Sequence, residues 1–281
     1  MGDLSDQGIK LWRISEFDNL ELLRAESIYH SYARHAHPGY SIGIIESGVG
    51  GSYYRGNTYL APPRSVVFMN PEEPHTGYSA EGLPLTYRML YPSFELVQQI
   101  ATEADIKGSP YFKEFFIEDD ALARQIFSLH IVLEQSPDRL EKQSSLVEVI
   151  STLLLNYADF ETRSRQPHQE HRAVQLIKAY LYENFSVNVS LEHLVDLTGL
   201  NRSYLIRVFR QTVGMPPYEY LTQIRVRKAK QLLEAGLPIA EVAIAVGMSD
   251  QSHLTRHFKS LVGMTPGHYR KMSTSFKTDD S

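Results

Sequence analysis

A repeat with a spacing of 49 residues limits what the C-terminal part of this chain can fold into. Residues 197–221, "LTGLNRSYLIRVFRQTVGMPPYEYL", match residues 246–270, "VGMSDQSHLTRHFKSLVGMTPGHYR", at apolar, basic, Gly-Met and Pro positions. Leu205 aligns with Leu254 and Phe209 with Phe258, each pair 49 residues apart. Such a repeat indicates two copies of one supersecondary unit.

The first copy has the pattern of helix, turn and helix. Ser190 is a good helix N-cap, and "LEHLVDLTG" after it spaces its apolar residues along one helical face. Gly199 predicts the end of that helix, because glycine is favoured just after a helix C-terminus. Asn201 or Ser203 then caps a second helix, whose inner face carries Leu205.

The second copy repeats this pattern. Pro238 stands at the start of a helix, where its missing N–H does no harm. Ala243 and Gly247 are small residues where two helices approach closely, and Asp250 caps the next helix. Two helices joined by a short turn containing glycine predict a helix-turn-helix unit, here over residues 190–213 and again over 238–262.

The second helix of each unit, about residues 201–212 and 250–261, is the predicted recognition helix. Its outward side chains suit base edges and phosphates, since Arg pairs with guanine and Gln with adenine. One charged helix surface is common, but two in register favour DNA binding. The predicted DNA-binding residues are Arg202, Ser203, Ile206, Arg207, Arg210, Gln251, Ser252, Thr255, Arg256 and Lys259.

The segment between the two units, "PYEYLTQIRVRKAKQLLEAG", predicts a linker helix of about 18 residues, roughly 27 Å long. A helix of that length can hold two recognition helices about one DNA turn apart, near 34 Å, in successive major grooves. We expect its "RVRKAK" run to touch the intervening phosphates.

The charge distribution agrees with this assignment. The net charge of −5 divides into 14 Lys/Arg against 23 Asp/Glu over residues 1–167, and 14 against 10 over residues 168–281. The first part is therefore at −9 and the second at +4. A positive part joined to a negative part indicates that only the C-terminal part meets a polyanion.

The C-terminal third resembles the DNA-binding domain of AraC/XylS family transcription regulators, over "LEHLVDLTGLNRSYLIRVFRQTVGMPPYEYLTQIRVRKAKQLL" and "IAEVAIAVGMSDQSHLTRHFKSLVGMTPGHYR". The resemblance implies binding of double-stranded DNA at asymmetric sites beside promoters, and contact with RNA polymerase in activators. By position it implies that Ser203, Ile206 and Arg207, then Gln251, Ser252 and Arg256, read bases. Because Ser203 is short and Ile206 apolar, we expect the first helix either to read thymine methyls or to contact few bases.

The N-terminal half has a different pattern. "YSIGIIESG", "GSYYRGNTYLA", "RSVVFMNP" and "LTYRMLYP" are short, β-branched and aromatic, and separated by Gly and Pro turns. They predict an antiparallel sandwich or barrel. "RHAHPGYSIGIIESG" and "NPEEPHTG" resemble the cupin-like effector domain of many AraC/XylS members, over about residues 20–95.

A cupin-like domain implies either a small-molecule pocket or a metal site, and a third possibility is that its histidines are purely structural. The residues expected to bind the small molecule are His35, His37, Tyr40, Glu46, Tyr53, Arg55, His75 and Arg88. Arg88 lies mid-strand, where its charge needs either a ligand carboxylate or a protein carboxylate. His35, His37 and His75 fall at metal-ligand positions of cupins, but Ser41 stands where the carboxylate ligand belongs. We therefore expect no metal and no cofactor, with the three histidines as the alternative site.

From residue 93 to residue 163 the pattern is helical, in the segments 93–104, 120–135 and 138–163. The last segment carries a wide apolar stripe, of which part covers the sheet and part pairs with a second subunit, as the resemblance implies for a homodimer. The polar stretch "RSRQPHQEH" predicts a linker.

Together these patterns predict an α+β protein: an N-terminal antiparallel cupin-like β-barrel with flanking helices, then an all-α domain of two helix-turn-helix units. The predicted domains are a ligand-sensing domain over 1–105, a helical dimerisation region over 106–165, a linker over 166–171 and a DNA-binding domain over 172–276. The absence of cysteine excludes disulfides and a Cys nucleophile. Without an apolar leader or a long apolar stretch, we expect a cytoplasmic protein with no membrane contact.

The predicted function is a sequence-specific, effector-sensing transcription regulator that is not an enzyme. The alternative is a cupin-type metalloenzyme with a helical C-terminal extension. That alternative leaves the 49-residue repeat and the charge asymmetry unexplained. The chain also shows no G-x-S-x-G, P-loop or H-E-x-x-H motif.

Overall fold

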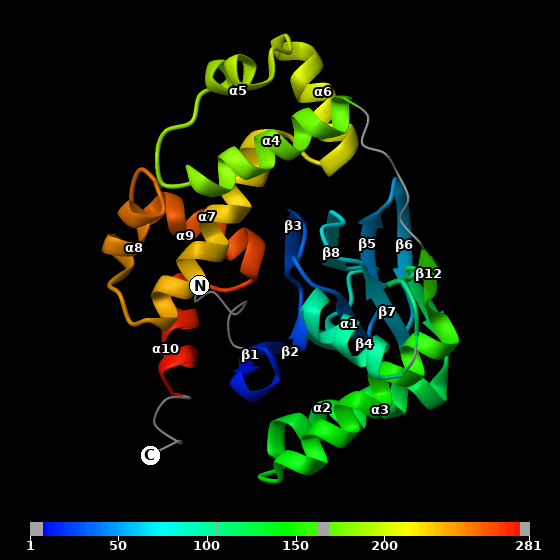
Figure 1. The fold of residues 1–281 in the computed structure, drawn as a ribbon. Coiled ribbons are helices and arrows are strands. Elements are labelled where there is room, and N and C mark those ends of the chain that lie inside the picture. Colours follow the sequence, from blue (N-terminus) through cyan, green and yellow to red (C-terminus); the bar gives the residue numbers. More distant parts are fainter. Residues whose placement is uncertain (1–7, 105, 162–168, 276–281) are drawn as a thin grey trace. The chain divides into compact units, whose positions relative to one another are not determined.

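The computed structural model describes residues 8–104, 106–161 and 169–275. The chain forms two compact units, residues 1–164 and residues 165–281 (Figure 1). The predicted α+β class is confirmed, with antiparallel sheets in the first unit and helices alone among the described residues of the second.

The N-terminal unit is built on two antiparallel sheets. The six-stranded sheet has the order β1-β2-β9-β4-β7-β11, and the four-stranded sheet the order β3-β8-β5-β6. The strands of the first are β1 (Ile9–Ile14), β2 (Leu20–Ile28), β9 (Leu85–Tyr91), β4 (Ser41–Ser47), β7 (Ser65–Met69) and β11 (Phe116–Glu118). Those of the second are β3 (Ser31–His35), β8 (His75–Ser79), β5 (Gly50–Tyr54) and β6 (Asn57–Ala61).

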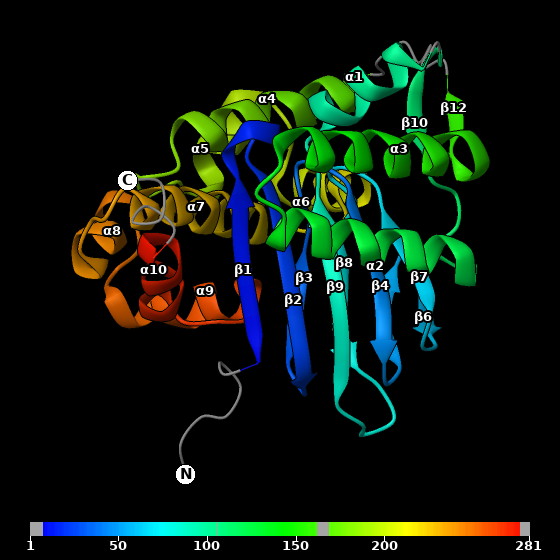
Figure 2. The same ribbon diagram turned by 90° about the horizontal axis from the view of Figure 1, so that it is seen from below.

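Three helices, α1 (Phe94–Glu103), α2 (Asp120–Gln135) and α3 (Arg139–Tyr157), supply the helical layer of this unit. Figure 2 shows α2 and α3 crossing one face of the six-stranded sheet. Alternation along each strand sends every second side chain to this face, as with Ile42 and Ile44 on β4 and Leu90 on β9, which join the helices in one core. The opposite face of the six-stranded sheet is thereby left free of these helices.

The helical stripe of α3 is used inside the subunit. The residues from this stripe that the structure buries against the sheet and α2 are Leu146, Val149, Ile150, Leu153 and Leu154. Leu153 and Leu154 have no exposed surface. These five residues are therefore the part of the stripe that covers the sheet, and pairing of the rest of this helix with a second subunit stays a prediction.

Several boundaries differ from the sequence expectations. The hairpin β1–β2 precedes the strands that the sequence predicted. Helix α3, the last helix of the N-terminal unit among the described residues, ends at Tyr157 rather than near residue 163. The chain continues as β12 (Asp159–Glu161), which pairs with β10 (Ser109–Tyr111). The region 106–165 thus contains three short strands besides α2 and α3. The predicted linker 166–171 lies partly outside the described residues, and a helix already begins at Gln169.

The C-terminal unit consists of seven described helices. They are α4 (Gln169–Glu183), α5 (Leu191–Thr198), α6 (Arg202–Val213), α7 (Pro217–Glu234), α8 (Ile239–Ala245), α9 (Gln251–Val262) and α10 (Pro266–Ser275). The predicted caps are confirmed. The side chains of Ser190, Asn201 and Asp250 accept hydrogen bonds from the backbone N–H groups of His193, Tyr204 and His253.

The repeat is therefore a repeat of structure. Helices α6 and α9 have the same length and end at Gly214 and Gly263, both in the left-handed conformation, with φ of 81° and 85°. Met215 and Met264 follow these glycines and are buried. Helix α7 contacts α4 and α6 on one side and α8, α9 and α10 on the other, so it connects the two helix-turn-helix units.

The basic run of α7 is only partly as expected. Arg225 is buried, and its guanidinium donates to the backbone carbonyls of Phe185 at 2.8 Å and Val187 at 2.9 Å. Arg225 thus holds the segment between α4 and α5, so it does not face DNA phosphates. Arg227, Lys228 and Lys230 are half-buried.

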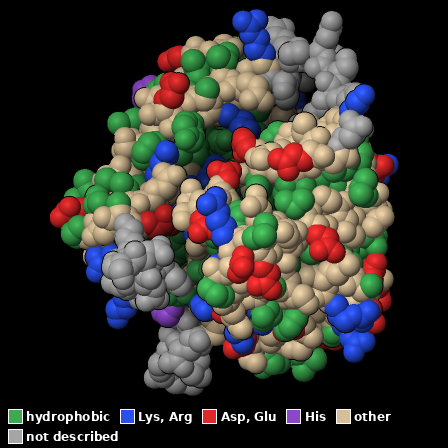
Figure 3. Space-filling model, turned by 60° about the horizontal axis from the view of Figure 1, so that its bottom comes forward, with side chains coloured by type: hydrophobic (Ala, Val, Ile, Leu, Met, Phe, Trp, Pro, Cys, Tyr) green, Lys and Arg blue, Asp and Glu red, His purple; other side chains and the backbone are tan. Residues whose placement is uncertain are grey.

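Among the described residues, no helix combines the length and the apolar character that a membrane crossing requires. On the face drawn in Figure 3, acidic and basic side chains are interspersed with hydrophobic ones.

The two turn glycines meet different surroundings, which yields a test of the repeat. Gly199 and Gly247 have φ of 69° and 73°, but a Cβ on Gly199 meets nothing within 4 Å, whereas one on Gly247 lies 2.5 Å from the carbonyl oxygen of Ser186. We expect Gly199→Ala to cost about 1–2 kcal/mol from backbone strain alone. Gly247→Ala adds a steric clash worth about 1–3 kcal/mol more. Urea unfolding of the C-terminal unit measures both, and equal losses would contradict this assignment of the turns.

Candidate functional site

A cavity of about 100 Å³ lies in the N-terminal unit and is lined by strands of both sheets. Its walls are largely apolar and aromatic, with Ile45, Val67, Met89 and Phe115 among them. A cavity that holds a water needs about 10–15 Å³ on this measure, so there is room for several waters or one compact ligand. None of the described residues that line it is a Lys or an Arg.

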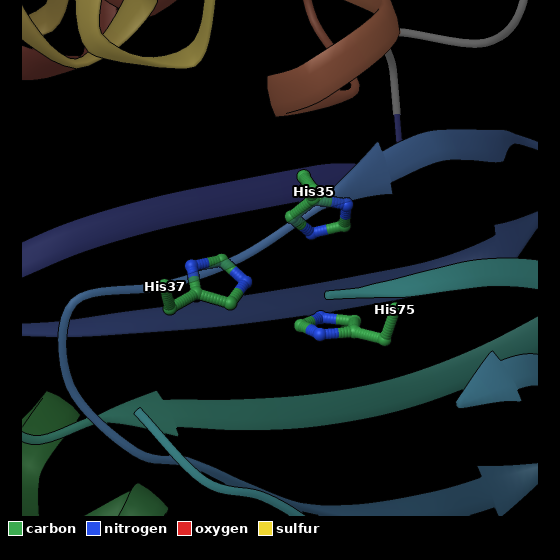
Figure 4. Close-up of side chains that lie close together, drawn as sticks. All are labelled: His35, His37 and His75. Carbon is green, nitrogen blue, oxygen red and sulfur yellow. The ribbon is translucent and has the colours of Figure 1, made fainter. Parts of the chain in front are cut away.

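Three histidines gather on the wall of this cavity (Figure 4). His35 ends β3, His75 begins β8, and the two are register partners across those strands. His37 lies in the segment that follows β3. The ring centroids of His35 and His75 are 4.5 Å apart, and His37 is 4.9 Å from His35 and 5.3 Å from His75.

Backbone carbonyls orient two of these rings. Nδ1 of His35 lies 2.7 Å from the carbonyl oxygen of Ala33, and Nδ1 of His75 lies 3.0 Å from that of Glu73. A carbonyl oxygen only accepts a hydrogen bond, so in both rings Nδ1 carries the hydrogen and Nε2 carries the lone pair.

Burial keeps these two rings neutral. It lowers the pKa of His35, and it lowers the pKa of His75 to about 3, with the neighbouring His35 charge as a further cause. Tyr32 also lines the cavity, and burial raises its pKa to about 12 against a smaller opposing effect of its 2.8 Å hydrogen bond with Tyr87.

Arg88 and Glu46 do not line the cavity. Nε of Arg88 forms an ion pair of 2.7 Å with Glu46, and its Nη1 lies 3.2 Å from Nδ1 of His130 on α2. Arg88 is only 4% exposed. A protein carboxylate therefore meets its charge in place of a ligand anion, which was the other alternative that the sequence left open.

Tyr40, Tyr53 and Arg55 also lie outside the cavity lining. The hydroxyl of Tyr40 is buried and donates to the carbonyl of Pro110 at 2.7 Å. Tyr53 is 39% exposed. Arg55 pairs with Glu73 at 2.7 Å and lies over the rings of Tyr54 and Tyr111. Of the eight expected ligand-binding residues, the structure brings only the three histidines to the cavity.

Sequence reasoning missed the aromatic residues of the cavity wall, namely His30, Tyr32, Tyr78, Tyr87, Tyr91 and Phe115. A signal for part of this set was present on β9. Tyr87, Met89 and Tyr91 alternate along "LTYRMLY", so they share one face, while Arg88 has the opposite parity and faces the helices.

The predicted DNA-binding residues lie as a surface on α6 and α9. Those that are exposed are Arg202, Ser203, Ile206, Arg207, Arg210, Gln251, Ser252 and Arg256, whereas Thr255 and Lys259 are half-buried. Two residues of the set illustrate contacts within the chain. Arg202 forms an ion pair of 2.7 Å with Glu192, and the hydroxyl of Thr255 donates to the carbonyl of Gln251.

This combination defines a class of protein: a β-sheet unit with a cavity between its sheets, joined to a unit with two helix-turn-helix motifs. Residues 19–150 match the AraC-like ligand binding domain, and residues 194–272 match a helix-turn-helix domain. The chain belongs to the AraC family of transcription regulators.

Individual relatives agree with the family. The HTH-type transcriptional regulator YbfI of Bacillus subtilis (strain 168) is 30% identical over 237 residues, which cover 84% of this chain and 86% of that protein. The HTH-type transcriptional activator RhaS of Yersinia pseudotuberculosis serotype I is 25% identical, and the match covers 88% of this chain and 92% of that protein. The crystal structure of ToxT from Vibrio cholerae O395 is similar in fold, with a TM-score of 0.56, 15% identity, and coverage of 95% and 97%.

The cluster around Arg88 predicts a pH dependence of stability. Burial, and then the charge of Arg88, lower the pKa of His130 to about 4, below its unfolded value near 6.5. The unfolded chain therefore takes up the proton first, and the stabilisation present above pH 6.5 is lost as the pH falls towards about 4. His130→Gln removes this component. The free energy of unfolding of the variant should therefore fall less steeply with decreasing pH than that of the wild type, with a slope smaller by up to about 1.4 kcal/mol per pH unit.

Urea unfolding of the N-terminal unit within the full chain, at several pH values, measures the difference in slope. His253→Gln, in the other unit, is the control and should leave that slope unchanged. Parallel pH profiles for the wild type and His130→Gln would show that His130 titrates normally in the folded protein.

Proposed function

We propose that this AraC-family regulator senses a compact small molecule in the cavity of its N-terminal unit. Its helices α6 and α9 read DNA in successive major grooves. The observation that carries the DNA proposal is the repeat: two capped helices of equal length, each ending in a left-handed glycine, present polar outer faces from one scaffold helix. The roughly 27 Å length of α7 suits motifs one DNA turn apart.

The two recognition helices differ in what they offer to bases. Helix α9 presents Gln251, Ser252 and Arg256, all with hydrogen-bonding groups. Helix α6 presents Ile206 and Arg207, and the guanidinium of Arg207 lies 5.1 Å from the ring of Tyr204. We infer that α9 makes most of the polar base contacts and that α6 relies on Arg207 and on apolar contact with thymine methyls.

The effector proposal rests on the cavity. Its small volume and apolar walls favour a compact molecule over a long one. ToxT of Vibrio cholerae, whose fold is similar, has been crystallised with an unsaturated fatty acid bound. A fatty acid carboxylate would find no Lys or Arg among the described residues that line this cavity, so the same ligand does not carry over directly.

A homodimer, contact with RNA polymerase, action in the cytoplasm and the absence of catalysis complete the proposal. The relatives are named as transcription regulators and activators, which supports these roles. The dimer would have to use the outer surfaces of α2 and α3, because the inner stripe is buried. Sedimentation velocity on the full chain tests it.

The DNA proposal predicts different effects for two neighbouring residues of α9. Arg256→Ala should cost about 1–3 kcal/mol at the specific site and relax the choice of one base pair. Lys259 lies in the last turn of α9, one turn further from the reading end. Lys259→Ala should weaken binding to all sequences alike and reduce the salt slope by about one.

The measurement is competition with single-base operator variants at several salt concentrations, after the bound sites have been mapped across the genome. Lys107→Ala, an exposed lysine of the N-terminal unit, serves as the charge-matched control. Equal losses for Arg256→Ala and Lys259→Ala on every sequence would show that α9 does not read bases.

The effector proposal predicts that filling the cavity abolishes ligand sensing. Val67 is buried and lines the cavity, so Val67→Phe places a ring in the space for the ligand. A compound that stabilises the wild type raises its melting temperature by mass action. Val67→Phe should lose this shift while its DNA affinity without the compound stays the same. If the variant keeps the shift, the ligand binds elsewhere.

A further inference from the structure

We propose that His35, His37 and His75 bind one divalent transition-metal ion and that the ion presents an open coordination position to the cavity. This inference rests on the proposed function, since it takes the cavity as the effector site. It adds the chemistry of recognition: the effector is a compact molecule that carries an anionic oxygen.

The positions of the nitrogen atoms support a metal site. One ligand nitrogen from each of the three rings lies within 4.8 Å of the other two. In a tetrahedral zinc site, nitrogen atoms at about 2.0–2.1 Å from the ion lie about 3.3 Å from each other. The ligand nitrogen atoms therefore need to approach one another by no more than about 1.5 Å.

The orientation of two rings is the one that metal-binding histidines have. Nδ1 of His35 and Nδ1 of His75 each donate to a backbone carbonyl, of Ala33 and of Glu73. This second hydrogen bond fixes the tautomer and leaves Nε2 as the donor atom for a metal.

The backbone holds these ligands on the walls of the unit. His35 and His75 are cross-strand partners of β3 and β8. The segment that carries His37 is held by a hydrogen bond of 2.7 Å, which the backbone N–H of Glu72 donates to the backbone carbonyl of His37. A site whose ligands stand on paired strands is set before the ion arrives, which lowers the ordering cost of binding.

The surroundings of the cluster indicate what the ion is for. Three neutral imidazoles would leave a bound divalent ion with its full charge. A charge in an apolar cavity is costly unless it is paired. None of the described lining residues is acidic, so the counter-charge has to come from the effector. The same ion gives an anionic effector the cation that the absent Lys and Arg do not supply.

Imidazole ligands suit zinc, copper, iron and nickel. Zn²⁺ and Co²⁺ are therefore the probes. The full-length protein is freed of metal with a chelator, dialysed and titrated with each ion by calorimetry, and the visible spectrum of the Co²⁺ form is recorded. We expect one ion per chain, a raised melting temperature and a tetrahedral Co²⁺ spectrum.

Three variants assign the site. His37→Ala changes a half-buried residue outside the strands, and His75→Ala changes a strand residue. Each should weaken binding about 100-fold or more and abolish the Co²⁺ spectrum. His30→Ala is the matched control, because His30 lines the same cavity outside the cluster, and it should bind like the wild type. Circular dichroism checks that each variant is folded. If His75→Ala does not fold, the result for His37→Ala decides the test alone.

The open position has its own test. Azide or acetate added to the Co²⁺ protein should change its visible spectrum, and Val67→Phe should prevent this change. The metal proposal is overturned if His37→Ala binds the metal ion as tightly as the wild type does. It is also overturned if none of the three variants changes the number of ions bound per chain. Compounds that still stabilise the chelator-treated protein leave the effector function standing without a metal. A Co²⁺ site that responds to no anion and a protein that no compound stabilises would instead remove the effector function.

Discussion

The N-terminal unit depends on the alternation of side chains across its six-stranded sheet. One parity of β4 and β9, with Ile42, Ile44 and Leu90, packs against α2 and α3 and forms the core. The other parity, with Ile45, Met89 and Tyr91, forms the cavity wall. Because the side-chain period of a strand is two, a slip of one residue in register would exchange the two sets. The helices thus create the cavity indirectly, by taking one face of the sheet and leaving the other face to a ligand.

The same alternation separates the two polar clusters of this unit. Arg88 belongs to the helix-facing parity, where Glu46, Glu134 and His130 surround it. The three histidines belong to the cavity side. A buried guanidinium needs a partner that stays in place, and strand and helix side chains supply one. The described lining of the cavity, by contrast, contains no Lys, Arg, Asp or Glu. Charge in the framework and neutrality in the cavity are consistent with a site that is filled from outside.

Much of the C-terminal unit could be predicted from the sequence because its signals are local. Ser190, Asn201, Asp250 and the left-handed glycines each act within one turn, and the repeat presented them twice. The cavity was less predictable. Its membership depends on which parity of each strand faces inward, and "LTYRMLYP" alone does not say whether Arg88 or Tyr87 does. Arg225 shows the same limit: its partners, the carbonyls of Phe185 and Val187, lie about 40 residues away in sequence. The histidines were found because His35 and His37 form the His-x-His pair of the cupin resemblance.

The position of the histidines within the four-stranded sheet bears on how a bound ligand could act. β3 is an edge strand of that sheet, paired only with β8 among its described strands, and its register shifts between Tyr32 and His35. Edge strands with irregular pairing are the least constrained elements of a sheet. A ligand can shift a conformational equilibrium only by as much as its affinity differs between the two states. A ligand bound at both His35 and His75 would join the edge strand to its neighbour where their pairing is irregular, so its binding free energy would act on that pairing.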